Sequence, residues 1–116
     1  EIIDTSLRDN AIVEGIVIKG KTLYLLYNDP LDNEKGDKNL YVFSIDSDTG
    51  LSKEIYKKKV FFSEQSEPEI FCTDEYIFIY EYSNDYEKTC ITRINRDGSS
   101  PVLLIDENGE IVMKPL

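Results

Sequence analysis

The sequence predicts an all-β protein of two similar units, each a four-stranded antiparallel sheet, with the two sheets packed face to face. Three observations support this prediction. The segment from residue 16 to 56 recurs, with a shortened loop, between residues 69 and 104. The apolar runs are short and rich in Ile, Leu, Val, Tyr and Phe, which suit a pleated, packed surface. Alanine, the strongest helix former, occurs only once, at Ala11.

The repeat is clearest in the second predicted strand of each unit, where residues 23–27 align with residues 76–80 at an offset of 53 positions. Further on, residues 42–45 meet residues 91–94 at an offset of 49. The decrease in offset from 53 to 49 indicates that the second repeat has a deletion in the loop between its second and third predicted strands. We therefore predict one all-β domain, residues 1–116, made of two repeats, about 15–58 and 68–105, and a C-terminal hairpin strand.

Period-two or continuously apolar stretches bounded by Gly, Asn, Asp and Pro mark the strands of the first unit. They are expected at residues 15–19, 22–28, 39–46 and 52–58. Lys19-Gly20-Lys21 makes the first turn. Asp46-Ser47-Asp48-Thr49-Gly50 makes the last, because Asp and Ser side chains bond their own backbone and glycine accepts a positive φ.

The second unit repeats this plan, with strands expected at residues 68–72, 75–81, 88–95 and 101–105. Tight turns are expected at residues 73–74 and 96–99. Pro101 opens an outer strand, one of the few positions in a sheet where proline is tolerated. A last hairpin, residues 103–106 and 110–114, turns at Glu107-Asn108-Gly109.

Residues 23–27 and 76–80 are apolar or aromatic without a gap, which indicates a sheet covered on both faces. Residues 21–27 and 39–50 resemble blade repeats of bacterial six- to eight-bladed β-propeller proteins. Residues 92–104 look similar to the strand, turn and outer strand of TolB-like propellers. The resemblance covers most of residues 16–105 and implies blade-like sheets in a bacterial protein of the cell envelope or secreted from the cell.

Two blades do not close a ring, and propellers usually have four or more. Three arrangements are left open by the sequence: a fragment of a longer propeller, self-association of several copies, or two sheets facing one another as a sandwich. In the first two arrangements, an apolar blade face becomes an interaction surface.

The long loops of a blade emerge at one rim, and here they are residues 28–38, 59–67 and 82–87. Long loops on a rigid scaffold commonly carry function. Carboxylates and tyrosines gather in these loops, and they suit a basic protein surface or a hydroxyl-rich ligand. The alternative is an ordinary solvated loop set. The candidate binding residues are Asp29, Asp32, Glu34, Asp37, Glu64, Glu67, Tyr82, Asp85, Tyr86 and Glu87.

The formal net charge of −10 argues against a nucleic-acid partner, because that affinity depends on Lys and Arg displacing counterions. The acidity serves either solubility or the recognition of a basic protein. No apolar run approaches the roughly eighteen residues of a membrane span, so no transmembrane segment is expected.

We expect no metal and no cofactor, because the chain has no histidine and only two cysteines. Cys72 and Cys90 lie in predicted strands that one strand separates, so two free thiols are favoured over a disulfide. The segment from Asp46 to Gly50 places two carboxylates two positions apart before a glycine, as calcium loops do. It lacks a third ligand and a distal glutamate, so an ordinary turn is favoured.

The absence of histidine also excludes Ser-His-Asp and Cys-His catalysis within this chain. A carboxylate pair could hydrolyse sugars, but nothing selects one pair among 23 acidic residues. We therefore expect a noncatalytic module that binds another macromolecule through its long acidic loops or an open blade face. The alternatives are a small acidic immunity or inhibitor-type protein that neutralises a basic toxin or enzyme, and a fragment of a carbohydrate-active propeller enzyme. Lys57-Lys58-Lys59 is expected to protect an outer strand against pairing.

Overall fold

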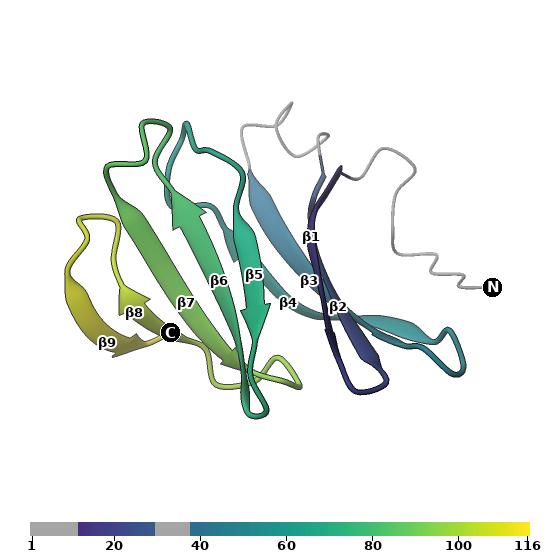
Figure 1. Cartoon of the computed structure of the whole chain (residues 1–116). Helices are drawn as coiled ribbons and strands as arrows, with labels where there is room; N and C mark the ends of the chain where they lie inside the picture. The colour runs from purple at the N-terminus through teal and green to yellow at the C-terminus, as the bar shows by residue number, and fades with distance from the viewer. Residues whose placement is uncertain (1–11, 30–37) are drawn as a thin grey trace. The chain divides into compact units, whose positions relative to one another are not determined.

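The structure is a computed structural model that describes residues 12–29 and 38–116 (Figure 1). In this part of the chain it is entirely β, with two antiparallel sheets and no helix. The predicted all-β, two-sheet fold is confirmed. The chain divides into two compact units, Glu1–Lys59 and Val60–Leu116, which we call unit 1 and unit 2. The boundary lies between the two predicted repeats.

The sheet of unit 1 is a simple meander in which each strand pairs antiparallel with the next. Its strands are β1 (Ile12–Lys19), β2 (Thr22–Asn28), β3 (Asn39–Asp46) and β4 (Ser52–Lys59). Strand β1 begins earlier than expected and contains a register shift between Val13 and Gly15. The turn after it needs Gly20, whose φ is +60°, a conformation that costs glycine little.

The sheet of unit 2 is also a meander, with five strands (Figure 1). They are β5 (Glu69–Cys72), β6 (Tyr76–Tyr82), β7 (Thr89–Asn95), β8 (Val102–Ile105) and β9 (Ile111–Pro115). The expected last hairpin is formed by β8 and β9, which makes β9 the fifth strand and an edge of the sheet.

The centre of unit 1 is an aromatic cluster carried by its two middle strands. The register places Tyr27 opposite Tyr41 and Leu25 opposite Phe43, and all four side chains are buried. The rings of Tyr27 and Tyr41 stack with centroids 4.9 Å apart. Such a pair contributes about 0.5–1.5 kcal/mol beyond its area burial. Four consecutive residues of β2, from Tyr24 to Tyr27, are buried, as expected for a strand covered on both faces.

Strand β6 of unit 2 differs from this expectation. Ile77, Ile79 and Glu81 are completely buried, whereas the four aromatic side chains at alternate positions are only half-buried. Aromatic residues occur on both half-open and covered sheet faces, so an uninterrupted apolar run could not distinguish the two cases. The prediction of full coverage on both faces holds for β2 and is wrong for β6.

The strand register shows that the two expected repeat offsets do not fit one pairing. Aligning β2 with β6 at an offset of 53 matches Leu23 with Tyr76. Leu23 pairs with Ile45 of β3, and Tyr76 pairs with Asn95 of β7. The third strands then align at an offset of 50. The expected offset for these third strands was 49. A slip of one residue exchanges the two faces of a strand. The pairs with the outer strands keep the offset of 49, because Val42 pairs with Tyr56 and Ile91 with Ile105, each beside a register shift. The two expected offsets therefore differ by one residue from what a single register allows.

Strand β4 is the edge strand that the lysine run was expected to protect. Lys58 departs from this role because its side chain is buried and its Nζ donates to the carbonyl of Lys59 at 2.6 Å. The Nζ of Lys57 lies 5.5 Å from the centre of the Tyr41 ring, a cation–π contact. The run therefore lies on an edge strand, and its Lys57 also packs against the aromatic cluster.

Candidate binding surface of unit 2

The predicted rim residues fall into three groups. Asp32, Glu34 and Asp37 lie outside the described residues. Asp29, at the end of β2, is only 4% exposed, so its carboxylate does not lie on an open surface. The remaining six residues belong to unit 2: Glu64, Glu67, Tyr82, Asp85, Tyr86 and Glu87.

Ser83 organises the loop between β6 and β7. Its backbone N–H donates to the carbonyl of Lys88 at 3.0 Å, and its own carbonyl accepts from the N–H of Tyr86 at 2.9 Å. Its hydroxyl accepts from the N–H of Lys88 at 3.0 Å and donates to Oδ1 of Asp85 at 2.6 Å. One serine therefore closes the loop with four hydrogen bonds. Serine and aspartate are suited to such turns because their short side chains reach nearby backbone groups.

The same bonds fix the charge of Asp85. Its Oδ1 accepts from the Ser83 hydroxyl and from the N–H of Glu87 at 3.1 Å. Hydrogen bonds to a carboxylate favour its ionised form. The Ser83 bond, the larger cause, and the backbone bond lower the pKa of Asp85 below its ordinary value. Asp85 thus presents a fixed negative charge at neutral pH.

The segment before β5 lies against this loop. Gln65 forms an isolated bridge with Ser83, and the hydroxyl of Ser66 donates to the carbonyl of Asn84 at 3.2 Å. Near its start, the N–H of Phe61 donates to Oε1 of the completely buried Glu81 at 3.1 Å. These contacts bring two predicted long loops of unit 2 together.

Two hollows of about 400 and 440 Å³ open between these segments, and Phe61, Phe62, Ser83 and Asp85 line both. We call them together the loop pocket. The first hollow is completed by Glu87, Lys88, Glu107 and Asn108, and the second by Ser63, Glu64 and Asn84. The pocket thus combines a phenylalanine pair with four carboxylates and one lysine. Of the predicted residues it unites Glu64, Asp85 and Glu87.

Tyr82 and Tyr86 form an aromatic pair at the same end of β6, with ring centroids 5.6 Å apart. The hydroxyl of Tyr82 donates to the carboxylate of Glu69. Burial, and next the bond to Glu69, raise the pKa of Tyr82 to about 12. Tyr86 is 65% exposed and has a φ of 61°, which is uncommon for a residue other than glycine. Its ring is therefore available for contact.

Glu67, the last of the six predicted residues in unit 2, is exposed but lines neither hollow of the loop pocket.

Several members of this surface were not predicted from the sequence. Phe61 and Phe62 lie in a predicted loop, where two adjacent large apolar residues are a signal that could have been used. Glu107 and Asn108 belong to the turn between β8 and β9 and join the pocket because β8 runs back to the same end of the sheet. No local sequence signal indicates that approach, since it depends on strand order.

The negative charge of the chain is concentrated in unit 2. Residues 60–116 contain twelve Asp and Glu against four Lys and Arg, a net charge of −8, whereas residues 1–59 contain eleven against nine, a net charge of −2. The unit that carries the loop pocket therefore accounts for most of the formal charge of −10. A field of this sign attracts cationic partners.

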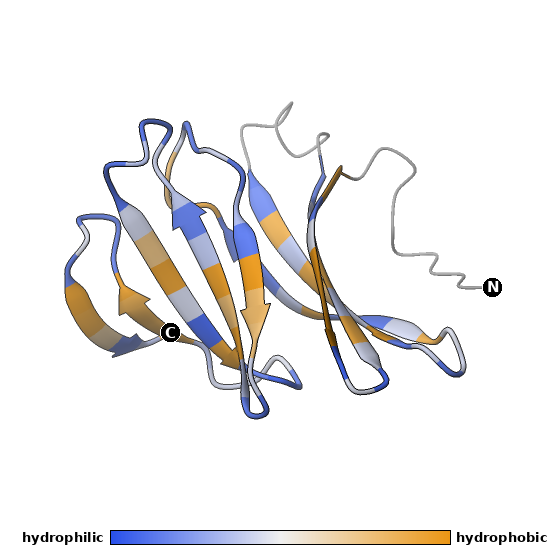
Figure 2. Cartoon of the chain, viewed as in Figure 1, coloured by the Kyte–Doolittle hydropathy of each residue, from blue (hydrophilic) through white to orange (hydrophobic). Residues whose placement is uncertain are grey.

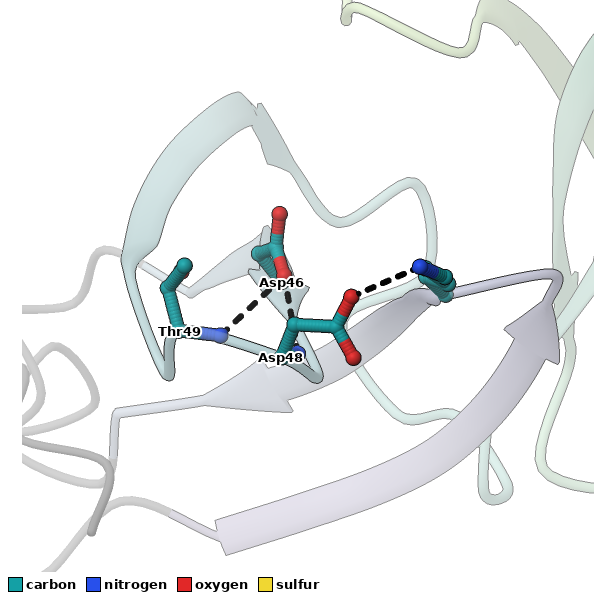
Figure 3. Close-up of polar contacts among 4 residues, drawn as sticks. Asp46, Asp48 and Thr49 are labelled. Carbon is teal, nitrogen blue, oxygen red and sulfur yellow. Dashed lines mark hydrogen bonds and ion pairs between the residues drawn. The ribbon is translucent and has the colours of Figure 1, made fainter.

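The alternative calcium loop of unit 1 is an ordinary turn, as favoured (Figure 3). Oδ1 of Asp46 accepts from the N–H groups of Asp48 and Thr49 at 2.9 and 3.2 Å, which is the bonding of an Asx turn. Asp48 forms an exposed ion pair with Lys21 at 2.9 Å. Across residues 12–29 and 38–116, no three Cys, Asp or Glu side chains are grouped so as to hold a metal ion.

The two cysteines are not joined by a disulfide, in agreement with the favoured prediction. Cys72 is half-buried on β5 and Cys90 is buried on β7. Strand β6 lies between them, as expected from the sequence.

In the part of the chain that the structure describes, no helix has the length and apolar character of a membrane span. Comparisons with protein-family models, with curated proteins and with solved structures found no match to this chain.

Proposed function

We propose that this chain is a noncatalytic binding module of two blade-like repeats, and that the loop pocket of unit 2 receives a basic protein surface. The single observation that carries the proposal is the loop pocket itself, in which Phe61 and Phe62 lie beside Glu64, Asp85 and Glu87. Apolar rings with surrounding carboxylates match a partner that combines Lys or Arg with apolar side chains.

Two further features support a basic partner. The net charge of −8 on unit 2 favours encounter with cations and disfavours anionic surfaces. The exposed Tyr86, paired with Tyr82, offers a large contact area with few rotatable bonds, and a tyrosine face can hold a guanidinium group. A Lys- or Arg-bearing segment can therefore gain apolar, aromatic and charge contacts together.

The proposal is tested by titrating the labelled chain with two synthetic peptides while amide NMR shifts are recorded. The peptides share the same apolar residues, but one carries Arg and Lys where the other carries Gln. We expect the basic peptide to shift the amides of residues 61–64 and 83–88. The Gln peptide is expected to leave them nearly unchanged, because it lacks the charge that the pocket carboxylates recognise.

Two variants that each remove two negative charges distinguish the contribution of the loop pocket to binding from that of the overall negative charge of unit 2. Asp85→Asn with Glu87→Gln removes two pocket charges while keeping their shape. Asp74→Asn with Glu75→Gln removes two charges from the turn between β5 and β6, at the opposite end of the strands. We expect the first variant to weaken the basic peptide on the order of tenfold and the second far less. Equal weakening by both would mean that only net charge acts, and would refute the pocket.

An acidic inhibitor of a basic enzyme or toxin is the second candidate, and the concentration of charge in unit 2 favours it. Such an inhibitor would use the same surface, but its association rate would depend more strongly on long-range electrostatic attraction to the basic partner. Salt distinguishes the two, because the Debye length falls from about 10 Å at 0.1 M to about 3 Å at 1 M. An inhibitor associates much more slowly at high salt, whereas a module held by apolar contact retains most of its association rate.

A further inference from the structure

Strand β9 differs from every other described strand, because each of its residues, Ile111–Pro115, is exposed. Ile111 is 78% exposed and Met113 is 54% exposed. Figure 2 shows that the strand is largely hydrophobic along this stretch. Within its sheet β9 pairs only with β8. It is therefore an apolar edge strand that is open on both faces.

The chemistry of an edge strand specifies its occupant. The outer side of β9 carries backbone N–H and C=O groups that point away from β8, and an extended strand is the structure that pairs with such a row. Apolar side chains on both faces add contacts above and below the new pairing. The occupant that fits is thus another β-strand with apolar side chains, and not a helix or a small molecule.

The sequence of β9 is complementary to itself. In an antiparallel pair arranged about a twofold axis at Val112, Glu110 of one copy lies opposite Lys114 of the other, and this occurs twice. Ile111 then lies opposite Met113, and Val112 opposite Val112. Opposite charges and apolar pairs directly across a pair of strands are stabilising.

Strand β9 is bent close to the proposed twofold axis. A register shift between Leu103 and Ile105 leaves Val112 and Met113 opposite Leu104, and Met113 has a φ of 48°. Such a bulge twists an edge and makes it a poor match for an ordinary flat strand. In the proposed pair, the twofold axis normal to the sheet places the bulges of the two copies next to each other, so that both strands bend at the same point.

We propose that β9 is a homodimer contact, in which two copies of this chain pair through this strand into one continuous ten-stranded sheet. The contact involves β9 and is independent of the loop pocket. Long-range repulsion between two acidic units is screened at physiological ionic strength, where the Debye length is about 8 Å, whereas the Glu110 and Lys114 pairs are in contact.

The test measures the solution mass of the purified chain by light scattering over a range of concentrations at that ionic strength. We expect the mass to rise with concentration from 13.4 kDa toward twice this value. Glu110→Lys places like charges opposite each other twice, and it should raise the dimer dissociation constant on the order of tenfold. Adding Lys114→Glu to the same chain restores opposite charges and should restore the dimer.

Two controls make the assignment specific. Val112→Glu places two carboxylates together at the twofold axis and should abolish the dimer without unfolding the chain, because Val112 lies on an exposed strand. Ile18→Glu makes the equivalent change on β1, the apolar edge of the other sheet, where Ile18 is 68% exposed, and should leave the dimer intact. A chain that stays monomeric at all concentrations overturns the proposal, as does a dimer that Ile18→Glu abolishes and Val112→Glu preserves.

Discussion

Ile79 lies at the centre of β6 and is completely buried, so its truncation tests whether unit 2 has a packed core. Replacing it with alanine removes three carbon atoms that no longer contact water in the folded state. Burial of each such group contributes about 0.8 kcal/mol, and the cavity left behind adds to the loss. We therefore expect Ile79→Ala to lower the free energy of unfolding by about 3 kcal/mol, inside the range of 2–5 kcal/mol for such changes.

This loss is large for a unit of this size. Small domains have about 0.05–0.15 kcal/mol of stability per residue, which gives about 3–9 kcal/mol for a unit the length of residues 60–116. Ile79→Ala should therefore remove between a third and all of the stability of unit 2. Ile79→Val, which removes one carbon, is expected to cost only about 1 kcal/mol.

The assay is urea unfolding followed by amide NMR peaks of unit 2, at a protein concentration where light scattering gives a monomer. Ile111→Ala is the matched control, because it deletes the same atoms from a side chain that is 78% exposed. Its effect should stay below about 0.5 kcal/mol. Equal losses for Ile79→Ala and Ile111→Ala would refute the assignment of β6 as the centre of a packed sheet.

Three other outcomes follow from local geometry. Tyr82 should ionise with a pKa of about 12 in an absorbance titration, above the ordinary tyrosine value of 10. The stability held by its neutral form should be lost as pH rises from 10 through about 12, because the unfolded chain releases this proton first. Glu69→Gln should lower this pKa only in part, since burial is the larger cause, and an unchanged titration would contradict the contact between Tyr82 and Glu69. Ser83→Ala should raise the carboxyl pKa of Asp85 toward its ordinary value and speed amide hydrogen exchange in residues 84–88. Identical pKa and exchange values in the variant and the unaltered protein would exclude the hydrogen-bonded loop. Gly20→Ala should cost about 1 kcal/mol in urea unfolding, because no atom lies within 4 Å of the added carbon and only the backbone φ of +60° opposes it.

Much of the fold could be predicted because strand formation depends on short-range patterns. The turn residues at Gly20 and at Asp46–Gly50 fixed where strands end, and the apolar runs between them fixed which segments form strands. The meander of each sheet then follows from short connections. The absence of a disulfide between Cys72 and Cys90 could be expected for the same reason, since a meander places β6 between β5 and β7.

The candidate surface could be predicted only in part. Glu64, Asp85 and Glu87 were recognised as residues of long loops at one rim, and the structure brings them into one pocket. Phe61 and Phe62 were missed because only the carboxylates and tyrosines of the long loops were taken as candidates. The fixed charge of Asp85 depends on hydrogen bonds from Ser83 and Glu87, and loop composition does not specify such bonds.

By itself, the sequence determined the β class, the two units, the turns and the acidic character of the chain, because each of these depends on neighbouring residues or on composition. Only the tertiary structure decided which face of each strand is buried, as the one-residue mismatch between the two repeat offsets and the half-open aromatic side of β6 demonstrate. The physical reason is that side chains alternate with a period of two, so register, and not composition, selects the face. The loop pocket and the exposed edge of β9 likewise arise from contacts between segments that are distant in the sequence.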